Sequence, residues 1–152
     1  MLDGSTKSWR EMMDVNVLGA AVMAREAIAL MRKHGTAGHI VNISSLSAYR
    51  IPKFPGGGWY AATKHALRCI SDGTRGEAQQ LKLPVRVSCI SPGVVDSEFY
   101  QARSGGSDSV QSVYDFEVLE TQHIVQALLY VLGAPAQVNV DDVIVRPIGQ
   151  PM

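Results

Sequence analysis

The stretch NISSLSAYRIPKFPGGGWYAATK, residues 42–64, joins a short apolar run to a loop rich in Pro and Gly and then to a helical pattern. The run over 39–43, HIVNI, is short and rich in branched side chains, which predicts a buried strand. Residues 45–58 are expected to form a loop, and 59–82 a helix that ends before Pro84. A strand, a loop and a helix in this order are typical of a parallel sheet with helical connections.

Before and after this stretch, the apolar residues again follow patterns typical of helices and strands in alternation. Ser8 and Glu11 have the spacing of a capping box at the start of a helix. The other predicted elements are a helix over 6–34, a strand over 85–90, a helix from a Thr121 cap to residue 132, and a strand over 142–146. We therefore predict an α/β fold with three strands and three main helices in a doubly wound parallel sheet. Because such a sheet is normally covered at its faces and edges, we expect more of it to precede residue 1.

Length, charge and cysteine content restrict the class of protein. The 152 residues predict a single domain, 1–152. Lys and Arg number 14, as do Asp and Glu, and the basic residues are scattered, so no nucleic-acid partner is expected. Two cysteines without a CxxC spacing, and an N-terminus unlike a signal peptide, predict a cytoplasmic protein. The longest apolar stretch, 18–24, is too short for a membrane span, and none of the four histidines has a second ligand at metal spacing.

Tyr60 and Lys64 are the first candidates for catalysis. A tyrosine hydroxyl has a pKa near 10, and a cation within about 4–6 Å favours the phenolate. Because the two residues are four apart in a predicted helix, their side chains share one helix face, as a tyrosine acid/base catalyst requires. Ser45 follows the first strand, and ligands bind outside the carboxyl ends of parallel strands. On their own, most Tyr-x-x-x-Lys pairs are surface contacts, and a serine that opens a loop is common.

Asn16 and the turn at Pro92-Gly93 are further candidates. Asparagine disfavours a helix interior, so the Asn16 side chain either turns to solvent at the edge of the apolar stripe or is held in a polar network. The Pro-Gly turn ends the second strand and is ordinary loop punctuation. The alternative is that the turn brings backbone amides near a ligand at that end of the sheet, with Ser97 as an added donor.

Together, these motifs resemble the short-chain dehydrogenase/reductase family. The family has an asparagine in a helical NVxG phrase, here Asn16–Gly19, and a strand that ends in serines, here Asn42–Ser45. It also has Tyr-x-x-x-Lys, here Tyr60–Lys64, and a Pro-Gly turn after the next strand, here Pro92–Gly93. All four occur in the family's order and span nearly the whole chain. The resemblance implies that the fold is the C-terminal part of a Rossmann-like doubly wound sheet.

The resemblance also implies a reaction and a role for each motif. The reaction is hydride transfer between NADP(H), or alternatively NAD(H), and a carbonyl or alcohol substrate such as a ketosteroid or another small carbonyl compound. Tyr60 is expected to be the acid/base, and Lys64 to favour its phenolate and hold the nicotinamide ribose. Ser45 is expected to bind the substrate oxygen, and Asn16 to anchor a water in the proton relay.

The same family implies where cofactor and substrate bind. The turn at Pro92 and Gly93, with Val94 and Ser97, is expected to line the nicotinamide site together with Tyr60 and Lys64. The family more often has threonine at the position of Ser97. Residues 96–118 are expected to form the substrate lid.

The cofactor half of the family pattern, with its Gly-rich first turn, is expected to precede residue 1. Family members usually form oligomers through two helices, and the resemblance assigns that role to 6–34 and 59–82, predicting a homodimer or homotetramer. Two hypotheses therefore stand. One is an oxidoreductase of which this chain is a fragment, and the other is a truncated, non-catalytic, dimer-forming member that does not bind cofactor alone.

Overall fold

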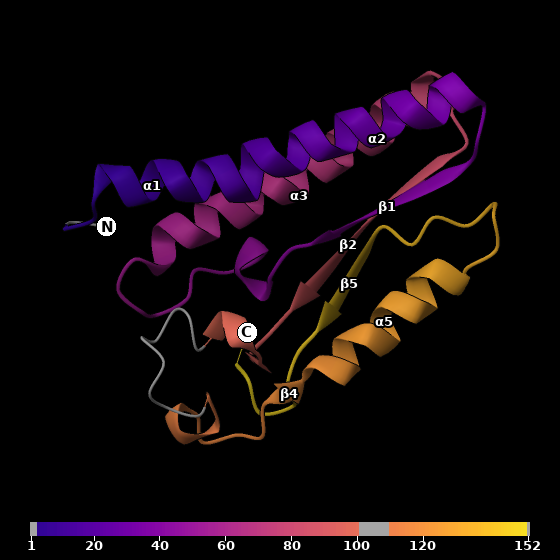
Figure 1. Ribbon diagram of the computed structural model, residues 1–152. Helices are drawn as coiled ribbons and strands as arrows, with labels where there is room; N and C mark the ends of the chain where they lie inside the picture. Colours follow the sequence, from indigo (N-terminus) through magenta and orange to yellow (C-terminus); the bar gives the residue numbers. More distant parts are fainter. Residues whose placement is uncertain (1–2, 101–109, 152) are drawn as a thin grey trace.

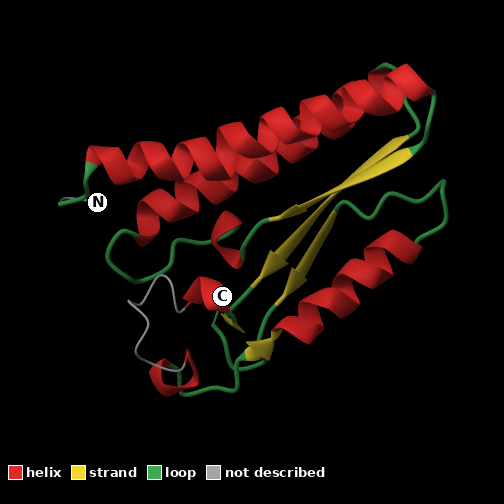
Figure 2. Cartoon of the chain, viewed as in Figure 1, coloured by secondary structure: helices red, strands yellow, loops and turns green. Residues whose placement is uncertain are grey.

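The computed structural model describes residues 3–100 and 110–151, and its centre is a three-stranded parallel sheet (Figures 1 and 2). The strands are β1 (Gly38–Ile43), β2 (Val85–Pro92) and β5 (Asp142–Val145), in the order β1-β2-β5. All three predicted strands are confirmed, although β2 runs two residues further than expected. The α/β class and the parallel arrangement are confirmed as well.

The register of the sheet brings the carboxyl ends of its strands to one edge. Gly38 pairs with Val85 and Ile43 with Ile90, while Pro92 pairs with Val145. Since the strands are parallel, the segments that follow all three strands leave from this edge.

Helices cover both faces of the sheet. On one face, α1 (Thr6–Met13), a π-helix (Asp14–Gly19) and α2 (Ala20–His34) form one long rod beside α3 (Gly57–Gln80), as Figure 1 shows. On the other face lies α5 (Thr121–Gly133), which packs on β2 and β5. Among the described residues, no helix has the length and apolar character needed to cross a membrane.

The starts of two helices differ from the sequence-based prediction. The capping box at Ser8 is wrong, because the first helix already begins at Thr6 and Ser8 lies inside it. A capping box occurs instead at α5, where the Glu120 backbone N–H donates to His123 Nδ1 over 3.0 Å. Thr121 is therefore the first residue of that helix and not its cap. Ser and Glu are only one of several pairs of polar residues that satisfy the free N–H groups in the first turn of a helix, and here Glu120 and His123 do so.

The predicted helix over 6–34 is interrupted by the π-helix. This insert contains Asn16 and ends at Gly19, two residue types that disfavour an α-helix interior. Short π-helical turns inside α-helices are frequent at functional sites.

The core is centred on β2, the middle strand. Val87, Cys89 and Ile90 are at most 1% exposed, and Leu67 of α3 and Val131 of α5 pack from opposite faces. Because β2 has a strand on each side and helices on both faces, even its polar residues Ser88 and Ser91 are fully buried.

The long polar region after β2 contains structure that the sequence did not predict. A second, two-stranded parallel sheet pairs β3 (Val95–Asp96) with β4 (Leu119–Glu120), and a 3-10 helix covers Val110–Val113. The predicted lid over 96–118 therefore begins and ends at this small sheet. Its residues 101–109 lie outside the described residues.

Candidate active site

A cavity of about 550 Å³ opens at the carboxyl ends of β1 and β2. All of the predicted site residues except Asn16 line it. They are Ser45, Tyr60, Lys64, Pro92, Gly93, Val94 and Ser97. The fold thus brings together side chains from the loop after β1, the start of α3 and the turn after β2, as expected for a ligand site in a parallel sheet.

Ser45 is held at the first bend after β1. The Ser44 N–H donates to the Ile90 carbonyl over 2.7 Å, which extends the pairing of β1 with β2 to the edge of the cavity. Ser45 then caps the 3-10 helix Leu46–Ala48, because its Oγ accepts from the Ser47 N–H over 3.1 Å. This bond uses the hydroxyl as an acceptor and leaves its proton available to donate to a ligand.

Tyr60 and Lys64 share one face of α3, as their spacing predicts. Tyr60 lies in the first turn of this helix, where the macrodipole favours negative charge. Lys64 Nζ lies 5.8 Å from the centroid of the Tyr60 ring and donates to the Ile43 carbonyl over 3.2 Å. This bond ties the ammonium to the carboxyl end of β1. Burial lowers the pKa of Lys64, partly offset by the neighbouring Cys89.

Asn16 does not line the cavity but is held in a polar network behind it. Its Nδ2 donates to Thr63 Oγ1 over 3.1 Å, and Thr63 Oγ1 donates to the Tyr60 carbonyl over 2.8 Å. Of the two alternatives for Asn16, the structure favours the network over the solvent-facing side chain. Thr63 is fully buried and was missed by the sequence analysis, although it stands next to Lys64 in the motif.

The turn after β2 is held from two directions. The Gly93 N–H donates to the Val145 carbonyl over 2.7 Å, and the Val94 carbonyl accepts from the Leu119 N–H over 3.0 Å. The Val94 N–H donates to Gln150 Oε1 over 3.0 Å. Gln150 also lines the cavity and was missed, because nothing in its local sequence distinguishes it from other polar residues near a chain end.

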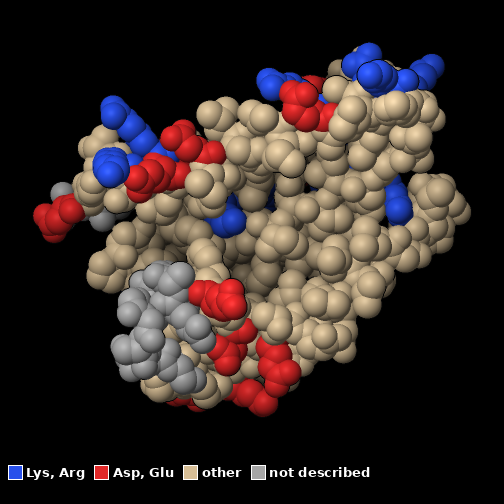
Figure 3. Space-filling model, in the orientation of Figure 1, with Lys and Arg blue, Asp and Glu red and all other residues tan. Residues whose placement is uncertain are grey.

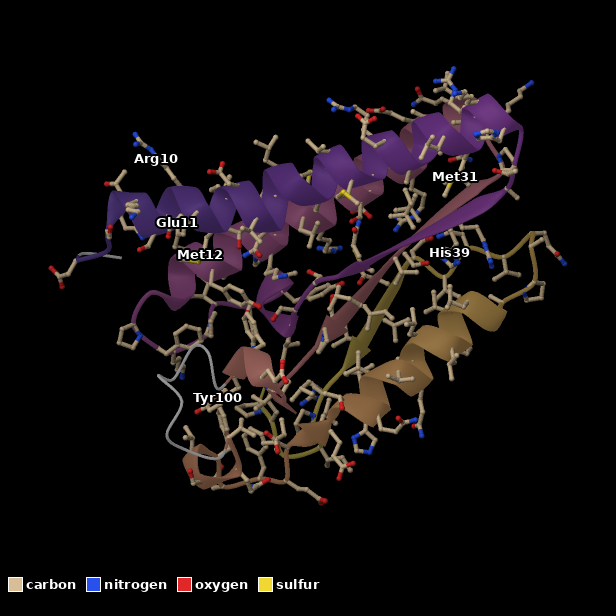
Figure 4. All side chains as sticks on the ribbon, viewed as in Figure 1. Arg10, Glu11, Met12, Met31, His39 and Tyr100 are labelled. Carbon is tan, nitrogen blue, oxygen red and sulfur yellow. The ribbon has the colours of Figure 1, made fainter. Side chains whose placement is uncertain are left out.

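The rest of the cavity wall is mainly apolar. It includes Phe54 from the loop after β1, Phe99 and Tyr100 from the segment after β3, and Ile124 and Leu128 from α5. Figure 4 shows Tyr100 at the carboxyl end of the sheet, far from His39 at the other end. The Phe99 ring centroid lies 6.3 Å from that of Tyr60. An apolar wall facing a few polar groups is typical of small-molecule sites.

Outside the cavity, charged groups of the described residues are scattered over the surface. On the face shown in Figure 3, most Lys and Arg lie in separate groups along the helical rod, with Asp and Glu beside several of them, and others lie in the hollow below the rod. Within the described residues, no group of three or more His, Cys, Asp or Glu is arranged to hold a metal ion.

The fold and the site together define a class of protein, and comparison with known proteins agrees. The family model for short chain dehydrogenases matches residues 1–107. The chain therefore belongs to the short-chain dehydrogenase/reductase family.

Relatives within this family cover nearly the whole chain. Dehydrogenase/reductase SDR family member 11 from Bos taurus is 35% identical over 153 residues, which are 99% of this chain and 60% of that protein. Farnesol dehydrogenase from Aedes aegypti is 34% identical over 143 residues, which are 93% of this chain and 55% of that protein. The chain thus spans about 60% of the length of such relatives.

Solved structures with the same fold include dinucleotide complexes. The closed form of serine dehydrogenase complexed with NADP+ has a TM-score of 0.86 at 29% identity, and the match covers 99% of this chain and 60% of that one. Serine dehydrogenase from Escherichia coli has a TM-score of 0.76 at 28% identity, with 99% of this chain and 58% of that one covered. These matches confirm the Rossmann-like character of the sheet.

Proposed function

We propose that this chain carries the catalytic and nicotinamide-binding part of an NADP(H)-dependent oxidoreductase that interconverts carbonyl and alcohol groups. One observation carries the proposal: Ser45, Tyr60 and Lys64 line the same cavity as the turn at Pro92–Val94. These groups come from three separate segments, so their convergence is much more specific than any of the single motifs.

Each side chain has a task in this proposal. Tyr60 transfers a proton to or from the substrate oxygen, and Lys64, whose Nζ lies 5.8 Å from the centroid of the Tyr60 ring, favours its phenolate. Ser45 donates a hydrogen bond from its hydroxyl to the same substrate oxygen. The hydroxyl is available for this, because in its contact with the Ser47 N–H the oxygen is only an acceptor. Asn16, through Thr63, fixes the helical turn that carries Tyr60 and anchors a water of the proton relay.

The residues fit the nicotinamide end of the cofactor. Lys64 offers a partly buried cation beside the ribose position, and the turn from Pro92 to Val94 offers a backbone surface without bulky side chains at Gly93. When bound, NADP(H) supplies or accepts the hydride. The choice of NADP(H) over NAD(H) is supported by the NADP+ complex of the similar serine dehydrogenase. The described residues include no Gly-rich turn after a strand that would bind the pyrophosphate.

The substrate in this proposal is a small, largely apolar carbonyl compound, with ketosteroids as one candidate class. The aromatic and aliphatic wall formed by Phe54, Phe99 and Leu128 suits such a molecule. In this proposal, the described parts of the predicted lid, 96–100 and 110–118, cover it. We also assign the chain, as a single domain 1–152, to the cytoplasm, in keeping with two free cysteines, Cys69 and Cys89.

The direct test is a titration of the purified 152-residue chain with NADPH, followed by nucleotide fluorescence. We expect saturable binding that weakens at least about tenfold in Lys64→Gln, since the variant loses a charged contact. Lys53→Gln is the matched control, because Lys53 is exposed and does not line the cavity. Folded wild-type protein that does not bind NADPH would contradict the proposal for this chain.

A second candidate function has its own observation. Four apolar side chains of the long rod are exposed: Val15 by 73%, Leu18 by 59%, Met23 by 70% and Leu30 by 58%. A groove of about 410 Å³ also runs between α2 and α3. Such a face favours association of two or four copies through these helices, with or without catalysis.

Sedimentation velocity distinguishes the two candidates when it is combined with the titration. A dimer or tetramer that binds NADPH supports the enzyme, whereas an oligomer without NADPH binding supports the non-catalytic alternative. Met23→Lys is expected to shift the protein towards monomer, and Arg10→Gln, on the same rod, is the control. A monomeric wild type would contradict the oligomer.

A further inference from the structure

The segment after β5 folds back against the turn after β2. The Gln150 N–H donates to the Pro147 carbonyl over 3.1 Å, and Arg146 Nη1 donates to the Gln150 carbonyl. These two bonds close the segment into a compact turn. Gln150 is only 5% exposed, so the turn carries this amide into the protein instead of into solvent.

The buried amide of Gln150 makes a specific contact. Its Oε1 accepts from the Val94 N–H over 3.0 Å, at the point where the chain leaves β2 and begins to line the cavity. Because Val94 N–H is a donor, the contact requires an acceptor and identifies the oxygen of the side-chain amide as the atom that faces the turn.

The neighbouring glycine makes this approach possible. A Cβ at Gly93 would clash with Gln150 Oε1 and would lie 2.9 Å from Arg146 Cβ, so no larger side chain fits there without displacing the segment. The same segment touches the predicted lid, since a Cβ at Gly149 would lie 2.6 Å from Phe116 Cβ. Gln150 therefore stands between the cofactor turn and the segment that leads into β4.

We propose that Gln150 is a positioning residue that fixes the turn at Pro92–Val94 in the shape needed to bind the nicotinamide. This inference rests on the proposed function, because it assigns Gln150 a role within the cofactor site. Its acceptor oxygen holds the Val94 N–H, and so the backbone that follows, in one orientation towards the cavity. The sheet alone does not do this, because the Gly93 N–H still donates to the Val145 carbonyl of β5, whereas the next N–H, that of Val94, donates to Gln150.

The chain contains a matched comparison for this contact. Asn139 is also a side-chain amide that bonds to the backbone of β2, accepting from the Val87 N–H over 2.9 Å. That contact lies near the amino end of the strand, and Asn139 does not line the cavity. Asn139→Leu therefore measures how the loss of an amide contact with β2 affects stability, without a change in the cavity lining.

The test uses the full chain, NADPH as the probe and two Gln150 variants. Gln150→Met has a similar length but no amide acceptor, and we expect its NADPH Kd to rise at least about tenfold. Gln150→Glu keeps an acceptor for Val94 N–H, removes the Nε2 donor and adds a carboxylate next to the Arg146 guanidinium, which compensates its burial, and we expect its Kd to stay within about threefold of wild type. Asn139→Leu should lower the melting temperature without changing the Kd. Unchanged binding in Gln150→Met, or equal loss in Gln150→Glu, overturns the positioning role.

Hydrogen exchange keeps the inference testable if the wild-type chain does not bind NADPH, which would count against the proposed function alone. The Val94 amide should then exchange at least about tenfold faster in Gln150→Met than in wild type, while the Val87 amide is unchanged. Equal exchange at Val94 in the two proteins overturns the inference.

Discussion

The two ends of the parallel sheet differ sharply in how their polar groups are used. At the amino end, Asn139 bonds to both the N–H and the carbonyl of Val87, and Arg75 Nε donates to the same carbonyl. Arg86 Nη1 donates to the Ala134 carbonyl over 2.8 Å. At the carboxyl end, the Ser45 hydroxyl and the Lys64 ammonium each make a single hydrogen bond within the described part of the chain, and both line an open cavity.

If the proposed function is correct, one sheet separates stability at its amino end from ligand binding at its carboxyl end. Bonds at the amino end satisfy backbone groups that would otherwise be buried without partners, so those side chains have little capacity left for a ligand. At the carboxyl end, Lys64 and Gln150 also bond to the backbone. The Ser45 hydroxyl and the Lys64 ammonium nevertheless have donor capacity beyond the single hydrogen bond that each makes within the described residues, and both groups line the cavity. Substitutions at the carboxyl end should therefore change turnover or NADPH binding, and substitutions at the amino end should change the free energy of unfolding.

The largest expected effect is at the carboxyl end, in Tyr60→Phe. If Tyr60 is the acid/base, turnover should fall by about 10²–10⁴-fold while NADPH binding is retained, because only the hydroxyl is removed. The measurement is NADPH oxidation with an apolar ketone as substrate, together with the fluorescence titration.

Tyr49→Phe is the matched control for this substitution. The Tyr49 ring lies against Arg68 and does not line the cavity. Burial, with Asp142 nearby, raises the pKa of Tyr49 to about 12, so this phenol is a poor proton donor or acceptor for a reaction at neutral pH. Turnover by Tyr49→Phe should stay close to wild type, and equal loss in both variants would argue against Tyr60 as the acid/base.

A smaller effect, on stability instead of turnover, is expected near the amino end of the sheet in Val87→Ala. Val87 is fully buried in β2, and the variant loses two methyl groups and leaves a cavity. The free energy of unfolding should fall by about 2 kcal/mol. Denaturant unfolding measures this loss, and the NADPH Kd should not change. Val113→Ala, at a side chain 54% exposed and away from the long rod, is the control and should cost less than about 0.5 kcal/mol.

A second contrast, between local patterns and long-range contacts, explains which features could be predicted from the sequence. The three strands follow from short branched runs bounded by Gly and Pro, and the neighbourhood of Tyr60 and Lys64 follows from helix periodicity. These signals are local, so each of these features can be predicted from residues that are neighbours in the sequence.

The features that were missed depend on residues far apart in the chain. Asn16 meets Thr63 across 47 residues, and Gln150 meets Val94 across 56. The pairing of β3 with β4 likewise joins two-residue strands that have no periodic signal of their own. No local pattern specifies such contacts, because they exist only after the sheet and its helices have assembled.

The smallest expected effect is a pH dependence of stability at the amino end. His39 lies on β1, at the opposite end of the sheet from Tyr100 (Figure 4), and its Nε2 lies 2.7 Å from Ser88 Oγ. Burial, and next the charge of Arg86, lowers the pKa of His39 below 6.5. The unfolded chain therefore binds a proton at a higher pH than the folded chain does, and stability is lost as the pH falls below about 6.5.

His39→Gln should remove the part of the stability loss at low pH that comes from protonation of His39. Melting temperatures at about pH 7.5 and about pH 5.5 should differ more in wild type than in His39→Gln, because only the wild type carries the titrating ring. His34→Gln, at an exposed position in the last turn of α2, should keep the wild-type difference. The NADPH Kd of His39→Gln at neutral pH should match wild type, since His39 lies outside the cavity lining. A changed Kd would mean that the two ends of the sheet are coupled, and the separation of stability from function along β1 and β2 would then be wrong.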